Sequence, residues 1–156
     1  VIGGFAATLF AYLVLTVLSP WLSWPSSSPV PSTRPGIHFF TGQDLSQQLA
    51  FMRHPQGHDI QAHVHKPVTR QVHFTQEVLV LRKGRLRVDF YDDDQNYLES
   101  HVLQSGDIIL LVKGGHGFHA LEEIEMFEIK QGPFTPEEDK VKFHGIQPNQ
   151  AQIVES

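Results

Sequence analysis

The sequence predicts an all-β fold for most of its length. From Ile37 onward, short runs rich in apolar residues recur about every ten residues, a spacing typical of a β-sandwich or β-barrel. Turn residues separate the runs, and from Ile37 onward only one stretch has the pattern of a helix. Because a closed sheet has no exposed strand edges, a β-barrel is the expected architecture.

The first 24 residues predict an N-terminal hydrophobic helix. Residues 1–33 contain no Asp, Glu, Lys or Arg, and 18 helical residues rise about 27 Å, close to the thickness of a bilayer's hydrocarbon core. Trp21 and Trp24 lie where aromatic anchors are found, and Pro20 would end the helix. We expect a transmembrane anchor. The sequence does not indicate on which side of the membrane the soluble part lies. A cleaved leader, or a buried helix of a cytoplasmic protein, is the alternative.

Residues 25–36 are rich in Pro and Ser and predict an extended linker to a domain at residues 37–156. Within that domain, residues 42–52 predict a short helix. The formal net charge of −5 comes without any run of basic residues, so we expect no nucleic-acid partner. The absence of cysteine excludes disulfides and cysteine-ligated zinc.

The run at residues 77–91 predicts two strands joined at Lys83 and Gly84 in a β-hairpin. Further strands are predicted at residues 97–103, 107–112, 117–123 and 125–132. The acidic run at residues 92–96 lacks the glycine and distal glutamate of a calcium loop, so we interpret it as a solvated hairpin turn.

Two histidines flank one valine in the stretch His63-Val64-His65. In a strand, side chains at i and i+2 point to the same face, so both imidazoles could reach one ion at about 2.1 Å. Ordinary strand-face histidines are the alternative.

Together with their neighbours, these residues resemble the cupin superfamily. Gly57, His63, His65, Glu77 and Gly84 match the first cupin motif, Gly-(X)5-His-X-His-(X)3-4-Glu-(X)6-Gly, except that eleven residues separate His65 from Glu77. Because this insertion is longer than in the motif, a Glu77 that points outward into solvent is the alternative to a metal ligand.

A second block, at residues 106–119, is similar to the second cupin motif, Gly-(X)5-Pro-X-Gly-(X)2-His-(X)3-Asn. Val112 stands in place of the motif's Pro, and the counted histidine position falls on Gly117. We favour His116 as the histidine of this motif, and His119 is the alternative. For His116 itself, the alternative to a metal ligand is a turn residue that is hydrogen-bonded by backbone groups.

The resemblance implies a cupin-type β-barrel, also called a double-stranded β-helix or jelly roll. It also implies a divalent ion inside the barrel, held by His63, His65, Glu77 and His116. Three imidazoles and a carboxylate suit iron, manganese, zinc and nickel alike, so the metal stays open. Such a set leaves positions free for water, oxygen or a chelating substrate.

The closing stretch at residues 128–143 resembles small bacterial cupins linked to surface-polysaccharide gene clusters. This resemblance implies a small oxygenated ligand, a sugar or nucleotide sugar, and a homodimer. The alternatives are a metal-free isomerase or epimerase that uses His63 or His65 as general base, and a non-catalytic accessory subunit of a larger membrane complex. Whether the chain is an enzyme stays open.

Overall fold

The computed structural model describes residues 12–15, 35–135 and 139–154. The chain divides into two compact units, and each is described by itself. The described parts of unit 1 are residues 12–15, 74–135 and 139–154, and that of unit 2 is residues 35–73. Within the described residues the elements are strands and one short 3-10 helix, η1 (Pro148–Gln150), and Asp139 alone is α-helical, so the predicted all-β fold is confirmed.

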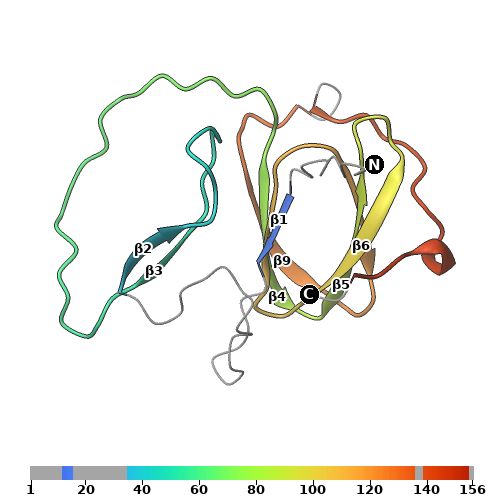
Figure 1. The fold of residues 1–156 in the computed structure, drawn as a ribbon, viewed down its shortest axis with the longest axis horizontal. Coiled ribbons are helices and arrows are strands. Elements are labelled where there is room, and N and C mark those ends of the chain that lie inside the picture. Colours follow the sequence, from blue (N-terminus) through green and yellow to red (C-terminus); the bar gives the residue numbers. More distant parts are fainter. Residues whose placement is uncertain (1–11, 16–34, 136–138, 155–156) are drawn as a thin grey trace, which may run out of the picture. The chain divides into compact units, whose positions relative to one another are not determined.

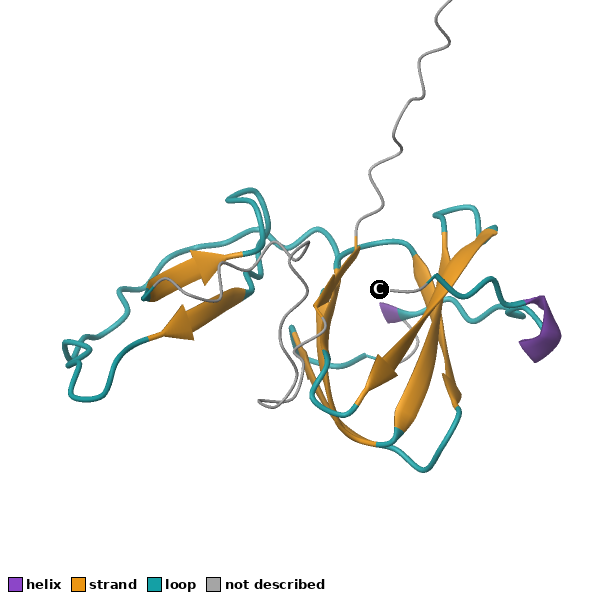
Figure 2. Ribbon diagram, turned by 60° about the horizontal axis from the view of Figure 1, so that its bottom comes forward, coloured by secondary structure: helices purple, strands orange, loops and turns teal. Residues whose placement is uncertain are grey.

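Unit 1 contains two antiparallel sheets (Figures 1 and 2). The four-stranded sheet has the order β1-β7-β4-β9, with β1 at Tyr12–Leu15, β7 at Ile108–Leu111, β4 at Glu77–Lys83 and β9 at Glu125–Lys130. The three-stranded sheet has the order β6-β5-β8, with β6 at Tyr97–Gln104, β5 at Arg85–Tyr91 and β8 at Gly115–Ala120. Within the described residues these strands form no closed barrel.

The hydrophobic core of unit 1 is built from side chains of both sheets. Leu79 and Leu81 supply it from β4, and Leu86, Val88 and Phe90 supply it from β5. Because side chains alternate along a strand, these residues define the inner face of each sheet. Leu103, Ile109 and Leu111 complete the buried cluster. The predicted strands at residues 97–103, 107–112, 117–123 and 125–132 are thus confirmed to within a few residues.

The predicted hairpin at residues 77–91 is wrong in its pairing. The chain does turn at Gly84, but β4 pairs with β7 and β9, whereas β5 pairs with β6 and β8. Gly84 has φ +83°, and a Cβ there would collide with the carbonyl oxygen of Glu123. The tight turn therefore passes the chain from one sheet to the other, because only glycine fits this conformation and this close approach.

The true hairpin joins β5 to β6 through the acidic turn, as predicted for a solvated hairpin turn. Asp92 Oδ1 accepts hydrogen bonds from the backbone N–H groups of Asp94 and Asn96 at 3.0 and 2.8 Å. The Asn96 side-chain amide donates to Asp92 Oδ2 at 3.0 Å. Asp92 therefore uses its carboxylate to close the turn.

The described part of the apolar N-terminal segment is a strand and not the predicted helix. Tyr12–Leu15 form β1, which pairs with β7 along its whole length and satisfies backbone groups that β7 would otherwise leave exposed. The remainder of residues 1–24 lies outside the described residues, as does all of the predicted linker except its last two residues. Among the described residues, no helix has the length and apolar character needed to cross a membrane.

Unit 2 contains a two-stranded antiparallel sheet of β2 (Gly36–Phe39) and β3 (Ala50–Arg53). The helix predicted at residues 42–52 is absent, because this stretch forms the connecting loop and the start of β3. Thr41 Oγ1 accepts a hydrogen bond from the Leu49 backbone, and Gln48 donates to the Gly42 carbonyl, so side chains satisfy loop groups that a helix would have paired.

Candidate functional site

Glu77 and His116 meet inside unit 1, one from each sheet. Glu77 begins β4 on the same face as Leu79 and Leu81, and it is only 4% exposed. His116 lies opposite Phe90 in the register between β5 and β8, so it also faces inward. The Glu77 Oε2 and His116 Nε2 atoms are 3.2 Å apart. The two sheets thus bring together two of the four predicted ligands.

Two lysines hold the other oxygen of the same carboxylate. Lys130 is the register partner of Glu77 on β9, and its Nζ lies 3.6 Å from Glu77 Oε1. Lys140 Nζ lies 3.4 Å from that oxygen. Lys130 also pairs with Glu128 at 3.1 Å and lies 4.2 Å from the ring centroid of Phe134. Glu77 therefore presents one oxygen to ammonium groups and the other to an imidazole.

This environment keeps Glu77 ionised. The hydrogen bond from His116 lowers the pKa of Glu77 to about 2, with the charges of His116 and Lys140 adding to it and burial opposing it. For Lys130, burial acts to lower the pKa, but Glu128 and Glu77 outweigh it and leave the pKa raised. A carboxylate that stays charged at neutral pH is available as a metal ligand or as an orienting group for the imidazole.

The distance between Glu77 and His116 is compatible with two ligands of one divalent ion. Two ligand atoms at about 2.1 Å from one ion, at angles of 90–109°, are about 3.0–3.4 Å apart. The observed 3.2 Å falls in this range. The lysine contacts at 3.4 and 3.6 Å are to Oε1, so they orient the carboxylate with Oε2 toward His116. A bound ion would take the place of the hydrogen bond between the two side chains.

The alternative histidine of the second motif has a different environment. His119 lies opposite Arg87 in the register of β8 and β5, on the outer face of the sheet. It is exposed, whereas the His116 side chain is 26% exposed and faces the interior. The geometry favours His116 over His119 as the partner of Glu77.

His63 and His65 lie in unit 2, outside any strand. The expectation that strand alternation would align them is therefore wrong, although their ring centroids are 5.1 Å apart at an interplanar angle of 78°. Both are exposed, and His63 Nδ1 lies 2.9 Å from the carbonyl oxygen of Gln61. The four predicted ligands are thus two pairs in different units. Considering described residues only, no three His, Asp or Glu side chains form a cluster that could hold an ion.

The sequence patterns did not predict several polar contacts. Lys140 had no local signal, because it reaches Glu77 from a segment far along the chain. His101 and Glu99 lie 3.1 Å apart on β6, on its inner face, and the His101 ring packs against Phe90. Their i, i+2 spacing within a predicted strand was an available signal. In unit 2, His54 and His58 stack with ring centroids 4.2 Å apart.

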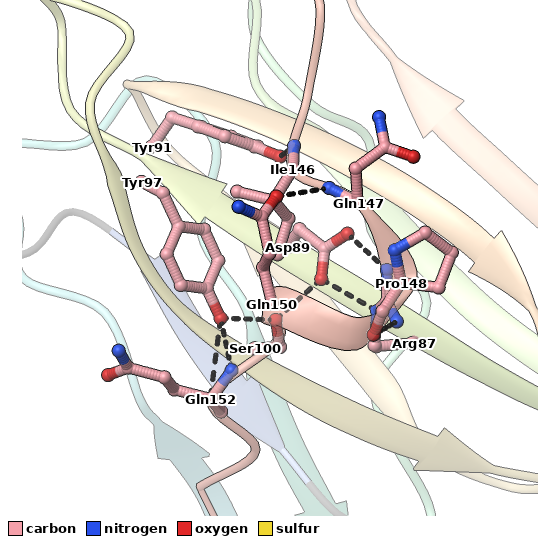
Figure 3. Close-up of polar contacts among 10 residues, drawn as sticks. All are labelled: Arg87, Asp89, Tyr91, Tyr97, Ser100, Ile146, Gln147, Pro148, Gln150 and Gln152. Atoms are coloured by element: carbon pink, nitrogen blue, oxygen red, sulfur yellow. Dashed lines mark hydrogen bonds and ion pairs between the residues drawn. The ribbon is translucent and has the colours of Figure 1, made fainter.

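A second polar cluster lies on the outer face of the three-stranded sheet (Figure 3). Arg87 donates two hydrogen bonds to the Asp89 carboxylate, at 2.8 and 3.0 Å, and both residues are buried. Ser100 Oγ donates to Asp89 at 2.5 Å and lies 2.7 Å from Tyr97 Oη. Because Ser100 is fully buried, it has no access to a substrate and is not a candidate nucleophile.

This outer cluster holds the C-terminal segment against the sheet. Arg87 donates to the Pro148 carbonyl at 3.2 Å, and Tyr97 Oη accepts from the Gln152 backbone N–H at 2.8 Å. Tyr91 Oη accepts from the Ile146 backbone N–H at 3.0 Å. Residues 152–154 also exchange backbone hydrogen bonds with Ser100 and so cover the edge strand β6. We call residues 146–154 the C-terminal strap.

Comparisons with known proteins give no match. No protein-family model matches the chain, and neither the curated proteins nor the solved structures contain a match to it.

Proposed function

We propose that the chain is a cupin-fold metalloprotein that binds a divalent ion and a small oxygenated ligand. The observation that carries this proposal is the convergence of Glu77 and His116, from two sheets, to 3.2 Å inside unit 1. These are the two residues that the cupin motifs name on β4 and β8. A sugar or nucleotide sugar is the ligand class that the resemblance suggests.

The finer fold assignment, a jelly-roll barrel, belongs to the same proposal. Going along the chain, β4 lies in the four-stranded sheet, β5 and β6 in the other, and then β7, β8 and β9 alternate between the two. Such alternation is expected when a chain winds through two facing sheets of a jelly roll. It supports the cupin architecture without depending on any single residue.

The ligands proposed from the geometry are Glu77 and His116 of unit 1. Iron, manganese, zinc and nickel all suit imidazole and carboxylate ligands. A bound ion would supply Lewis-acid or redox chemistry to an oxygenated ligand. Lys130 and Lys140 would hold the Glu77 carboxylate in one orientation.

Metal content tests this proposal. The full chain, purified without chelator and then incubated with each candidate ion, is expected to retain about one ion per chain. His116→Ala is expected to lose most of it. His119→Ala is the matched control on the same strand and is expected to retain the metal.

Two results would contradict the proposal. One is a wild-type chain that holds no ion in stoichiometric amount under any of these conditions. The other is equal metal loss in the His116 and His119 variants, which would place the ion elsewhere.

A metal-free acid–base enzyme is the second candidate, and the same pair favours it. An ionised carboxylate at 3.2 Å from an imidazole orients that ring and supports its role as a general base or acid, as a sugar isomerase or epimerase requires. This candidate predicts a bell-shaped pH profile and turnover that a chelator leaves unchanged. Loss of turnover on chelation, restored by added ion, would exclude it.

An accessory subunit of a membrane complex is a third candidate. The apolar side chains of Phe127 and Ile129 are exposed on β9, an edge strand, as is common where a protein contacts another chain. Mild detergent extraction followed by size measurement separates the outcomes. Co-migration with a larger complex supports a subunit, whereas a monomer or homodimer contradicts it.

A further inference from the structure

We propose that unit 2 contains a second ligand site, a pocket beside Arg70 that binds a small hydroxylated anion such as a sugar acid or sugar phosphate. The described residues that line this pocket all belong to unit 2. The inference is therefore independent of a metal ion and of the Glu77 and His116 pair in unit 1.

The pocket lies between the loop that joins β2 to β3 and a separate, later segment of the chain (Figure 1). Its volume of about 710 Å³ is within the range of about 300–1,000 Å³ that is usual for small-molecule sites. Its lining combines one aromatic ring, several hydroxyl and amide side chains and one cation: Phe39, Thr41, Gln43, Ser46, Gln48 and Arg70.

Hydrogen bonds hold the wall formed by the β2–β3 loop in one conformation. The Phe40 backbone N–H donates to the Leu49 carbonyl at 2.9 Å and so closes the base of the loop. Thr41 Oγ1 accepts from the Leu49 backbone N–H at 3.2 Å, and Gln48 Nε2 donates to the Gly42 carbonyl at 3.0 Å. Because the loop is ordered before a ligand arrives, less conformational entropy is lost on binding.

Arg70 supplies a positive charge that nothing in the pocket balances. Among the described residues it has no hydrogen-bond or ion-pair partner, and it is the one charged side chain that lines the pocket. The two aspartates of unit 2, Asp44 and Asp59, are not among the lining residues. Unit 2 has four Lys or Arg residues against these two aspartates, although the whole chain has a net charge of −5. The pocket is therefore complementary to a negative group.

The other lining groups indicate what else the ligand carries. A guanidinium binds a carboxylate or a phosphate through two parallel hydrogen bonds. The Thr41 hydroxyl accepts from the backbone and keeps its own proton to donate, and the Gln43 amide both donates and accepts, so these groups suit ligand hydroxyls. Phe39 is 60% exposed and offers an apolar surface to a ring. A polyanion is not indicated, because it requires clustered basic residues.

Calorimetric titration of the full chain with glucuronate and glucose 6-phosphate tests the inference and separates carboxylate from phosphate recognition. Glucose is the uncharged analogue, and inorganic phosphate is the anion without ligand hydroxyls on a ring. We expect at least one sugar anion to bind with an affinity that falls as salt is added. Glucose should bind at least about tenfold more weakly, since the charge-assisted hydrogen bonds are lost.

Two variants locate the binding site. Arg70→Met should weaken binding of the sugar anion at least about tenfold. Lys66→Met is the matched control, because it removes one positive charge from the same exposed segment but does not line the pocket, and it should leave binding unchanged. Chelator treatment and His116→Ala should also leave binding unchanged, because the pocket uses neither a metal nor unit 1.

Four results would overturn the inference: no binding of either sugar anion, equal binding of glucose, equal binding of glucose 6-phosphate and inorganic phosphate, or equal effects of the Arg70 and Lys66 variants. Loss of binding in His116→Ala or after chelation would place the ligand in unit 1 and would also overturn it. Metal content measured on the same samples reports separately on the proposed function, which none of these results alters.

Discussion

Replacing Glu77 by glutamine should remove a pH-dependent part of the stability of unit 1. The hydrogen bond from His116, with the charges of His116 and Lys140, lowers the pKa of Glu77 from 4.5 to about 2 against the effect of burial. A carboxyl whose pKa is depressed in the folded state stabilises the fold above its unfolded pKa. That stability is lost as pH falls from about 4.5 toward about 2, and glutamine cannot show this loss.

The size of the effect follows from the shifted pKa. Each tenfold change in proton affinity is worth about 1.4 kcal/mol, so ionised Glu77 stabilises the fold by at most about 3 kcal/mol at neutral pH. By pH 3 about 2 kcal/mol of this is gone. Because the Lys140 side chain is 42% exposed, solvent screens its share, so these are upper values.

The assay is urea unfolding of the wild type and Glu77→Gln at several pH values between 7 and 3. We expect the stability difference between them to shrink by about 2 kcal/mol over this range. Burial raises the pKa of Asp107, but that group titrates in both proteins and cancels in the comparison. Glu125→Gln, at an exposed position on β9, is the control and should differ little from the wild type at any pH. A difference for Glu77→Gln that stays constant from pH 7 to pH 3 would refute the reasoning.

Three further substitutions test the fold. Arg87→Met should destabilise the chain by about 3–5 kcal/mol in urea unfolding, because it leaves the carboxylate of its partner buried and unpaired. The control Arg85→Met, at an exposed position, should destabilise it by less than about 1 kcal/mol. Equal effects of the two variants would contradict a buried ion pair. Gly84→Ala should lower the stability more than Gly57→Ala. Both glycines have positive φ, but only at Gly84 would a Cβ meet a backbone carbonyl. Melting temperatures of the two variants, compared in a thermal-shift assay, check this order. Tyr97→Phe should loosen the C-terminal strap and speed its removal by carboxypeptidase, and an unchanged rate would show that the hydroxyl does not hold it.

The strands of unit 1 could be predicted from the sequence because each is short, apolar and bounded by turn residues. Their pairing could not. Alternation along residues 85–91 specifies which side chains share a face, but it does not specify which strand lies alongside. The turn at Gly84 was correctly located and wrongly interpreted, since the contact that makes it a crossing between sheets comes from Glu123, far along the chain.

Local sequence patterns also gave a wrong prediction where side chains, and not a regular helix, hydrogen-bond to the backbone groups. Residues 42–52 have helix-compatible spacing, yet Thr41 and Gln48 bond to loop groups. The apolar run at Tyr12–Leu15 suited a helix equally well, but β7 offers it an unpaired strand edge. Where such a run could adopt either structure, the available tertiary partner decides.

At the candidate site, the sequence predicted the pair Glu77 and His116 but not the lysines that contact Glu77. The resemblance named Glu77 and His116, although neither keeps the full spacing of its motif, and the two lie together in the structure. Lys130 lies on a predicted strand, but its place opposite Glu77 depends on the register of β4 and β9. Lys140 could not be found, because nothing in its neighbours indicates a contact with β4.

The two oxygens of Glu77 explain why one arrangement supports two different chemistries. Oε1 is held by ammonium groups at 3.4 and 3.6 Å, so the carboxylate keeps one orientation whether or not an ion is present. Oε2 then faces His116 with a lone pair available, either to accept the imidazole proton or to share an ion with the ring. Removing the lysines should therefore weaken both functions, whereas replacing the imidazole should abolish metal retention and acid–base turnover alike. Chelation separates the two, because it affects only the chemistry that needs the ion.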